Sequence, residues 1–92
     1  MEQVVALSQK EKIKEMMVEY FVKVEGIAEE IATNGETRVE DLDIDSLNIV
    51  EMLYNIEDKY GIRVDNLGVL KDMTIDAMAE FLNSLATSKV AA

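Results

Sequence analysis

The feature that most limits the fold of this chain is a helical spacing of apolar residues near its start. Apolar side chains recur at i, i+3, i+4, i+7 and i+11 as Ile13, Met16, Met17, Tyr20 and Val24. This spacing places them on one face of an α-helix. Just before it, Ser8 and Glu11 form the Ser-x-x-Glu pattern of a capping box. The sequence therefore predicts a first helix over residues 9–24, ending near Gly26.

A long connection, residues 26–44, separates this helix from the second. Its clearest turn signal is the stretch Thr-Asn-Gly-Glu-Thr. Four apolar residues are expected to hold the connection against the core: Ile27, Ile31, Val39 and Leu42. The second helix is predicted from Ser46 to Tyr60, where Gly61 is the expected C-terminal glycine.

Two more helices are predicted after Gly61. A short, irregular one covers about 66–70 and is interrupted by Gly68, and Thr74 is expected to cap the last. The chain shows no strand-like alternation and contains no proline. We therefore predict an all-α fold, a small four-helix bundle with a long first loop and a short third helix.

One domain is expected from a chain of 92 residues. We place this domain at residues 8–84, with a flexible N-terminus at 1–7 and a flexible tail at 85–92. Hydrophobic residues make up 49% of the chain, enough for a packed core. No apolar run is long enough for a membrane span, so we expect a cytoplasmic protein without a membrane partner. We also expect the protein to be a monomer.

Missing residue types exclude several kinds of chemistry. The chain has no cysteine, which excludes disulfides and thiolate metal sites, and no histidine, the usual general base near neutral pH. The formal net charge is −10, and residues 36–58 hold eight acids against Arg38 alone. Nucleic acid is therefore not an expected ligand, whereas a basic protein partner is favoured. A solvated acidic face that only confers solubility is the alternative.

The second helix has more apolar surface than one core face needs. On a helical wheel, the core side is formed by Ile49, Met52, Leu53, Ile56 and Tyr60. A second apolar strip lies beside it and consists of Leu47, Val50 and Tyr54, with Glu51 and Asp58 on one side and Glu57 on the other. An apolar centre with a charged rim is typical of a docking surface. Alternatively, neighbouring segments cover Leu47 and Val50; Tyr54 is expected to be at least partly exposed.

Three aspartates, Asp41, Asp43 and Asp45, directly precede Ser46. They fit positions 1, 3 and 5 of an EF-hand loop, but position 6 is Ser46 instead of glycine and position 12 is Met52 instead of glutamate. No metal site of high affinity is therefore expected. Ser46 also lacks the base that a nucleophilic serine needs, so an intrinsic enzyme is not expected.

A modification site is the remaining interpretation of Ser46. A serine at a helix N-terminus lies beside free backbone N–H groups, which stabilise an added phosphate. Alternatively, Ser46 or Asp45 is simply the N-cap of the helix.

The stretch DLDIDSLNIVEMLYNIEDKYGI, residues 41–62, resembles the attachment signature of the acyl carrier proteins. In that family Asp-Ser-Leu opens an acidic second helix, which leads to an aromatic-Gly-Ile ending. The resemblance covers about residues 9–83. It implies that Ser46 bears a 4'-phosphopantetheine arm, transferred from coenzyme A by a phosphopantetheinyl transferase. It also implies that Asp45 helps to bring metal and transferase to the serine, and that acyl groups are held on the arm as thioesters.

The same resemblance implies a partner-binding helix that presents Leu47, Val50, Glu51, Tyr54, Glu57 and Asp58. Its partners would be enzymes with basic docking patches that load, condense or transfer acyl groups. Asp43 departs from the family, which has glycine there, and Ile44 replaces a small residue common in carriers of general fatty-acid synthesis. These departures favour a polyketide or other specialised acyl pathway. An unmodified acidic helical adaptor that docks a basic protein is the alternative function.

Overall fold

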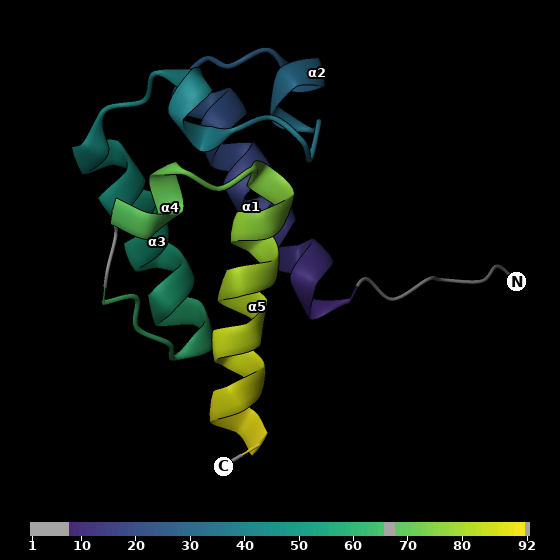
Figure 1. The fold of residues 1–92 in the computed structure, drawn as a ribbon, viewed down its shortest axis with the longest axis vertical. Helices are drawn as coiled ribbons and strands as arrows, with labels where there is room; N and C mark the ends of the chain where they lie inside the picture. Colours follow the sequence, from purple (N-terminus) through teal and green to yellow (C-terminus); the bar gives the residue numbers. More distant parts are fainter. Residues whose placement is uncertain (1–7, 66–67, 92) are drawn as a thin grey trace, which may run out of the picture.

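The computed structural model describes residues 8–65 and 68–91, apart from the side chains of residues 69 and 88–91. Its elements, in chain order, are α1 (Gln9–Lys23), α2 (Glu29–Ala32), the 3-10 helix η1 (Val39–Leu42), α3 (Ser46–Tyr60), α4 (Gly68–Lys71) and α5 (Ile75–Ala91) (Figure 1). Within the described ranges no strand forms, although an isolated antiparallel bridge joins Arg38 to Thr74. The predicted fold class, a small all-α bundle, is confirmed.

The helix ends follow the capping residues of the sequence. Ser8 Oγ accepts a hydrogen bond from the Glu11 N–H at 3.1 Å, and the Ser8 N–H donates to the Glu11 carboxylate at 3.0 Å. Gly61 ends α3 with a left-handed backbone, φ 65°, which glycine adopts without a steric cost. At the start of α5, Thr74 Oγ1 accepts from the Ala77 N–H at 3.0 Å. These three predicted helix ends are confirmed.

The core lies where the three long helices meet. Helix α1 packs chiefly against α5 and also contacts α2 and α3, while α4 contacts η1 (Figure 1). The buried side chains are Ile13, Met17, Phe21, Ala32, Val39, Leu42, Ile49, Met52, Leu53, Ile56, Ile62, Leu70, Ile75, Met78, Ala79, Leu82 and Ala86. No charged or polar residue is buried in the described part of the chain. The charges of this acidic protein therefore lie at its surface.

The long connection is more structured than the sequence suggests, because it contains α2 and η1. Val39 and Leu42 are buried and Ile27 is half-buried, as predicted. Ile31 is not part of the core, since 46% of its surface is exposed, and the adjacent Ala32 is buried instead.

The buried face of α1 is also rotated from the predicted one. Phe21 is fully buried, whereas Val24 is 58% exposed. Phe21 lies one turn beyond the buried Met17, while Val24 lies past the last helical residue, Lys23, and serves as the C-cap. Tyr20 is half-buried at the edge of this face.

The C-terminal part differs from the prediction in two places. Helix α5 continues to Ala91, so residues 85–91 are helical and not a loose tail. The reason is that Ala86, which is buried, continues the face of Met78 and Leu82. Among the described residues helix α4 covers Gly68–Lys71, so Gly68 is helical and does not interrupt it as predicted. Residues 1–7, 66–67 and 92, including the predicted flexible N-terminus, lie outside the described residues.

The turn before α3 contains a backbone conformation that L-residues rarely adopt. Asp43 has φ 54° and ψ 43°, and it alone among the described non-glycine residues has a positive φ. The left-handed conformation costs a residue with a Cβ about 1–2 kcal/mol, somewhat less for Asp. Glycine at this position would remove that cost, although its greater loss of entropy on folding offsets about 0.5–1 kcal/mol.

We therefore expect Asp43→Gly to raise the free energy of unfolding by up to about 1 kcal/mol, measured by urea denaturation. Asp41→Gly is the matched control, because it also removes one carboxylate but lies in η1 with no positive φ. It should be destabilising. If both variants lowered the free energy of unfolding equally, the left-handed backbone at Asp43 would not be a source of strain.

Candidate functional site

Ser46 is the first residue of α3, and Asp45 is its N-cap. Asp45 Oδ1 accepts a hydrogen bond from the Leu47 N–H at 2.9 Å. The Asp45 carbonyl accepts from the N–H groups of Asn48 and Ile49 at 3.0 and 3.2 Å. Asp45, and not Ser46, is thus the cap, so the Ser46 hydroxyl is not used to begin the helix.

The Ser46 side chain is exposed. In the part of the chain that the structure describes, no group hydrogen-bonds to its hydroxyl. A serine without a base at hydrogen-bonding distance remains an ordinary alcohol. The geometry therefore leaves Ser46 open to a reagent or enzyme that approaches from outside.

A cavity of about 190 Å³ lies beside Ser46, between the first turns of α3 and α4. It is lined by Ser46, Ile49 and Val50 from α3 and by Gly68 and Lys71 from α4. Its walls are largely apolar, and among the described residues that line it Lys71 is the one basic residue. A group attached to Ser46 would therefore find apolar surface beside it, in a cavity that Lys71 also lines.

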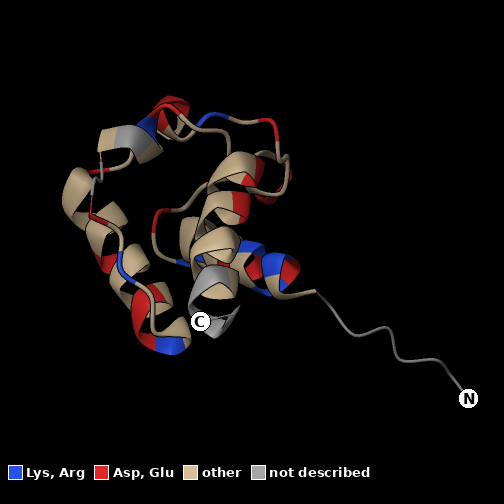
Figure 2. Cartoon of the chain, turned by 60° about the horizontal axis from the view of Figure 1, so that its bottom comes forward, with Lys and Arg blue, Asp and Glu red and all other residues tan. Residues whose placement is uncertain are grey.

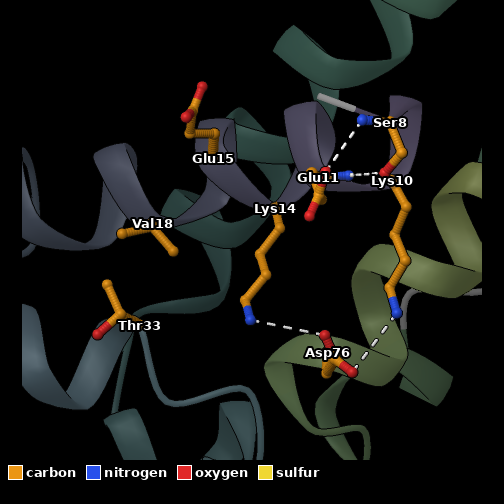
Figure 3. Close-up of a pocket in the computed structure, with 8 residues that line it drawn as sticks. All are labelled: Ser8, Lys10, Glu11, Lys14, Glu15, Val18, Thr33 and Asp76. Carbon is orange, nitrogen blue, oxygen red and sulfur yellow. Dashed lines mark hydrogen bonds and ion pairs between the residues drawn. The ribbon is translucent and has the colours of Figure 1, made fainter. Parts of the chain in front are cut away.

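A larger cavity, about 610 Å³, lies elsewhere, between α1, the end of α2 and the start of α5 (Figure 3). Lys10 and Lys14 both point towards Asp76: the Lys10 Nζ lies 3.5 Å from Asp76 Oδ2, and the Lys14 Nζ lies 3.6 Å from Asp76 Oδ1. The Asp76 N–H also donates to the carbonyl of Gly35 at 2.9 Å. These contacts join α1, the long connection and α5 to one another. Ser46 does not line this larger cavity, so the cavity lies outside the candidate site.

The second apolar strip of α3 is exposed. Leu47 is 77%, Val50 41% and Tyr54 66% exposed, while the predicted core residues Ile49, Met52, Leu53 and Ile56 are buried and Tyr60 is half-buried. Of the two alternatives for Leu47 and Val50, the structure shows the exposed one. The three side chains form an apolar surface that begins next to Ser46.

Within the described residues, the acids of α3 take part in no ion pair. The ion pairs found there join Lys10 and Lys14 to Asp76, Lys23 to Glu19, and Arg38 to Glu40. Glu51 and Asp58 are exposed, and Glu51 accepts a hydrogen bond from the Tyr20 hydroxyl at 2.9 Å. Figure 2 shows red segments before and along α3, whereas blue and red segments alternate in the first turns of α1. The negative charge of α3 is thus available to a partner.

Glu57 differs from the other two acids of the strip. It is half-buried, and its Oε2 accepts a hydrogen bond from the Val64 N–H at 2.6 Å. The Glu57 carbonyl also accepts from the Ile62 N–H at 3.1 Å. Glu57 therefore stabilises the loop after α3 through these hydrogen bonds. It also lies at the rim of the apolar strip, as the helical wheel predicts.

Asp41, Asp43 and Asp45 do not converge on a common point. The described residues contain no group of three or more Asp or Glu side chains that could hold a metal ion. Asp45 is engaged as the cap, and Asp43 lies in the left-handed turn. An EF-hand needs these carboxylates around one ion, so the calcium interpretation has no support in the geometry.

We expect Mg²⁺ and Ca²⁺ to raise the melting temperature similarly and only at roughly millimolar concentrations. Both ions would screen the acids around α3, because no set of ligands is preorganised for calcium. Thermal melts at constant ionic strength test this expectation. Saturation by micromolar Ca²⁺ with no effect of Mg²⁺ would contradict it.

The chain matches the family model described as the phosphopantetheine attachment site over residues 17–82. It is 32% identical over 75 residues to the meromycolate extension acyl carrier protein of Mycolicibacterium smegmatis, covering 82% of this chain and 76% of that protein. It is 34% identical over 80 residues to the protein of the same name from Mycolicibacterium aurum, covering 87% and 81%. An acyl carrier protein of Rhodococcus erythropolis is 35% identical over 63 residues, covering 68% and 69%.

The comparison with solved structures found no significant match. In the described part of the chain, no helix is long and apolar enough to cross a membrane. The family model spans α3 with its exposed serine and most of the buried core. The chain therefore belongs to the acyl carrier proteins, non-catalytic carriers in acyl biosynthesis whose cofactor is 4'-phosphopantetheine.

Proposed function

We propose that Ser46 is the attachment residue and that the protein presents acyl groups, bound to its arm, to partner enzymes through the exposed face of α3. The observation that supports this proposal best is the position of Ser46. It is exposed at the first position of α3, and its hydroxyl is unengaged because Asp45 provides the cap. The attachment forms a bond from Ser46 Oγ to the phosphorus on the pantetheine side of coenzyme A while the pyrophosphate bond breaks. Adenosine 3',5'-bisphosphate is the leaving group, and the hydroxyl proton passes to the transferase or to water.

The residues around Ser46 suit a phosphodiester. The N-terminus of α3 favours negative charge through its backbone dipole. Lys71 lines the same cavity as Ser46 and would offset the repulsion from Asp43 and Asp45. When bound, the cofactor supplies the thiol that this cysteine-free chain lacks, and acyl groups attach to that thiol as thioesters.

The proposed docking face consists of Leu47, Val50, Glu51, Tyr54, Glu57 and Asp58. Its apolar centre is exposed and its rim acids lack ion-pair partners in the described residues. Such a surface suits enzymes with a basic patch around an apolar depression. The transferase and the enzymes that load, condense or transfer acyl groups would use this face in turn.

The pathway is proposed from the relatives and from the sequence together. The names of two relatives refer to meromycolate extension, and Asp43 and Ile44 depart from carriers of general fatty-acid synthesis. Both observations favour a carrier dedicated to a specialised acyl chain, of the fatty-acid or the polyketide type. Loading the arm with acyl groups of different lengths and measuring transfer to candidate condensing enzymes would distinguish these pathways.

The alternative function is an unmodified adaptor that uses the same acidic face to dock a basic protein. Incubation of the unmodified protein with coenzyme A, Mg²⁺ and a broad-specificity phosphopantetheinyl transferase separates the two. Mass spectrometry of the intact protein should show the gain of one phosphopantetheine group. A protein that stays unmodified would support the adaptor and overturn the carrier proposal.

A further inference from the structure

We propose that Tyr20 of α1 is a positioning residue that orients Glu51 of α3 for partner proteins. This inference rests on the proposed function, because it assumes that Glu51 belongs to the docking face. Tyr20 itself lies outside α3 and outside the apolar strip. Its effect would pass through the Glu51 carboxylate.

The two residues are joined across the helix interface. The Tyr20 hydroxyl donates to Glu51 Oε1 at 2.9 Å, although the residues lie 31 positions apart in the sequence. Tyr20 is half-buried and packs against the core. The hydroxyl therefore extends from a ring whose position is fixed by packing. The bond engages one carboxylate oxygen, which leaves Oε2 for a lysine or arginine of a partner.

A neutral donor orients Glu51 without cancelling its charge. Partial burial, together with the carboxylates of Glu51 and Glu25, raises the pKa of Tyr20 to about 12. The hydroxyl therefore remains protonated at neutral pH, and the folded protein loses this bond only as the pH rises through about 12. Glu19 on α1 differs from Glu51 in this respect. Its carboxylate lies 3.0 Å from the Lys23 Nζ, and this cation offsets its negative charge.

Restricting Glu51 should favour association. A free glutamate samples many rotamers, and immobilising one such side chain in an interface carries a substantial entropic cost. The hydrogen bond from Tyr20 restricts the Glu51 rotamers in the free protein. Glu51 therefore loses less conformational entropy when a partner binds. We expect Tyr20→Phe to lower kcat/KM for loading of Ser46 by about 3- to 10-fold.

A double-mutant cycle tests whether Tyr20 acts through Glu51. The rates of loading by the transferase are measured for the wild type, Tyr20→Phe, Glu51→Ala and the double variant. Tyr20→Phe should lower kcat/KM in the wild-type background and change it little in the Glu51→Ala background. Tyr60→Phe is the matched control, because Tyr60 is half-buried in α3 and its hydroxyl has no partner within the described residues. It should load like the wild type.

Two results would overturn the inference while the proposed function stands. The first is that Tyr20→Phe loads as fast as the wild type. The second is that Tyr20→Phe causes the same loss with and without Glu51. Circular-dichroism melts of each variant check that a loss does not come from unfolding. A wild-type protein that is not loaded at all would instead overturn the proposed function and, with it, the role of Tyr20.

Discussion

Replacement of Ser46 by alanine should abolish loading completely. Ser46→Ala removes the only oxygen through which the proposed ester can form at this position. The variant should still fold, because Asp45 keeps the N-cap of α3 and the exposed Ser46 side chain contributes no described hydrogen bond. After incubation with coenzyme A and transferase, the intact mass should equal that of the starting protein.

Ser84→Ala is the matched control for this experiment. Ser84 is also exposed, but it lies within α5 and donates to the Phe81 carbonyl at 2.7 Å. This variant should gain one group as the wild type does. A Ser46→Ala protein that still gains the group would show that another residue is the attachment site.

Charge reversal on the docking face should have the second-largest effect. Glu51→Lys and Asp58→Lys each place a cation opposite the basic patch of a partner, so repulsion between like charges replaces attraction. We expect each to lower kcat/KM for loading by about 10-fold at low salt, mainly through slower association. The loss should shrink at physiological ionic strength and above, because screening weakens interactions between exposed charges.

Folding should be little affected by either reversal, since both residues are exposed and neither takes part in a described ion pair. Glu51→Lys also removes the hydrogen bond from Tyr20, so it should be the less stable of the two variants. Glu80→Lys is the matched control, because it makes the same change of charge at an exposed position on α5. Loading that falls equally in Glu80→Lys would point to net charge instead of this face.

The features that the sequence predicts well are local ones. The capping box at Ser8 depends on residues three apart, and the end of α3 depends on a glycine that can adopt a positive φ. The helical period of α3 places Ile49 on the buried face and Leu47 on a second strip, but it does not decide whether neighbouring segments cover that strip, and the structure shows Leu47 exposed.

The features that the sequence does not predict depend on tertiary contacts. Tyr20 fits the apolar spacing of α1, and nothing local indicates that its hydroxyl meets Glu51, 31 residues away. Lys71 is a lone lysine in sequence and reaches the cavity at Ser46 only because α4 packs there. Phe21 follows Met17 at the helical spacing, but the period alone does not decide whether Phe21 or its neighbour Tyr20 is the more buried. Nor does it show that Ile31 is exposed, since that depends on which neighbours cover the helix.

The most direct test of the central claim is to locate the phosphopantetheine group in the loaded wild-type protein. Trypsin, which cuts after Lys and Arg, should release residues 39–59, because these follow Arg38 and end at Lys59. Ser46 is the only serine or threonine in that peptide. Fragment-ion mass spectrometry should place one group on this peptide at Ser46 and none elsewhere. An adduct on any other peptide, or on another residue of this one, would contradict the assignment of Ser46 as the attachment site.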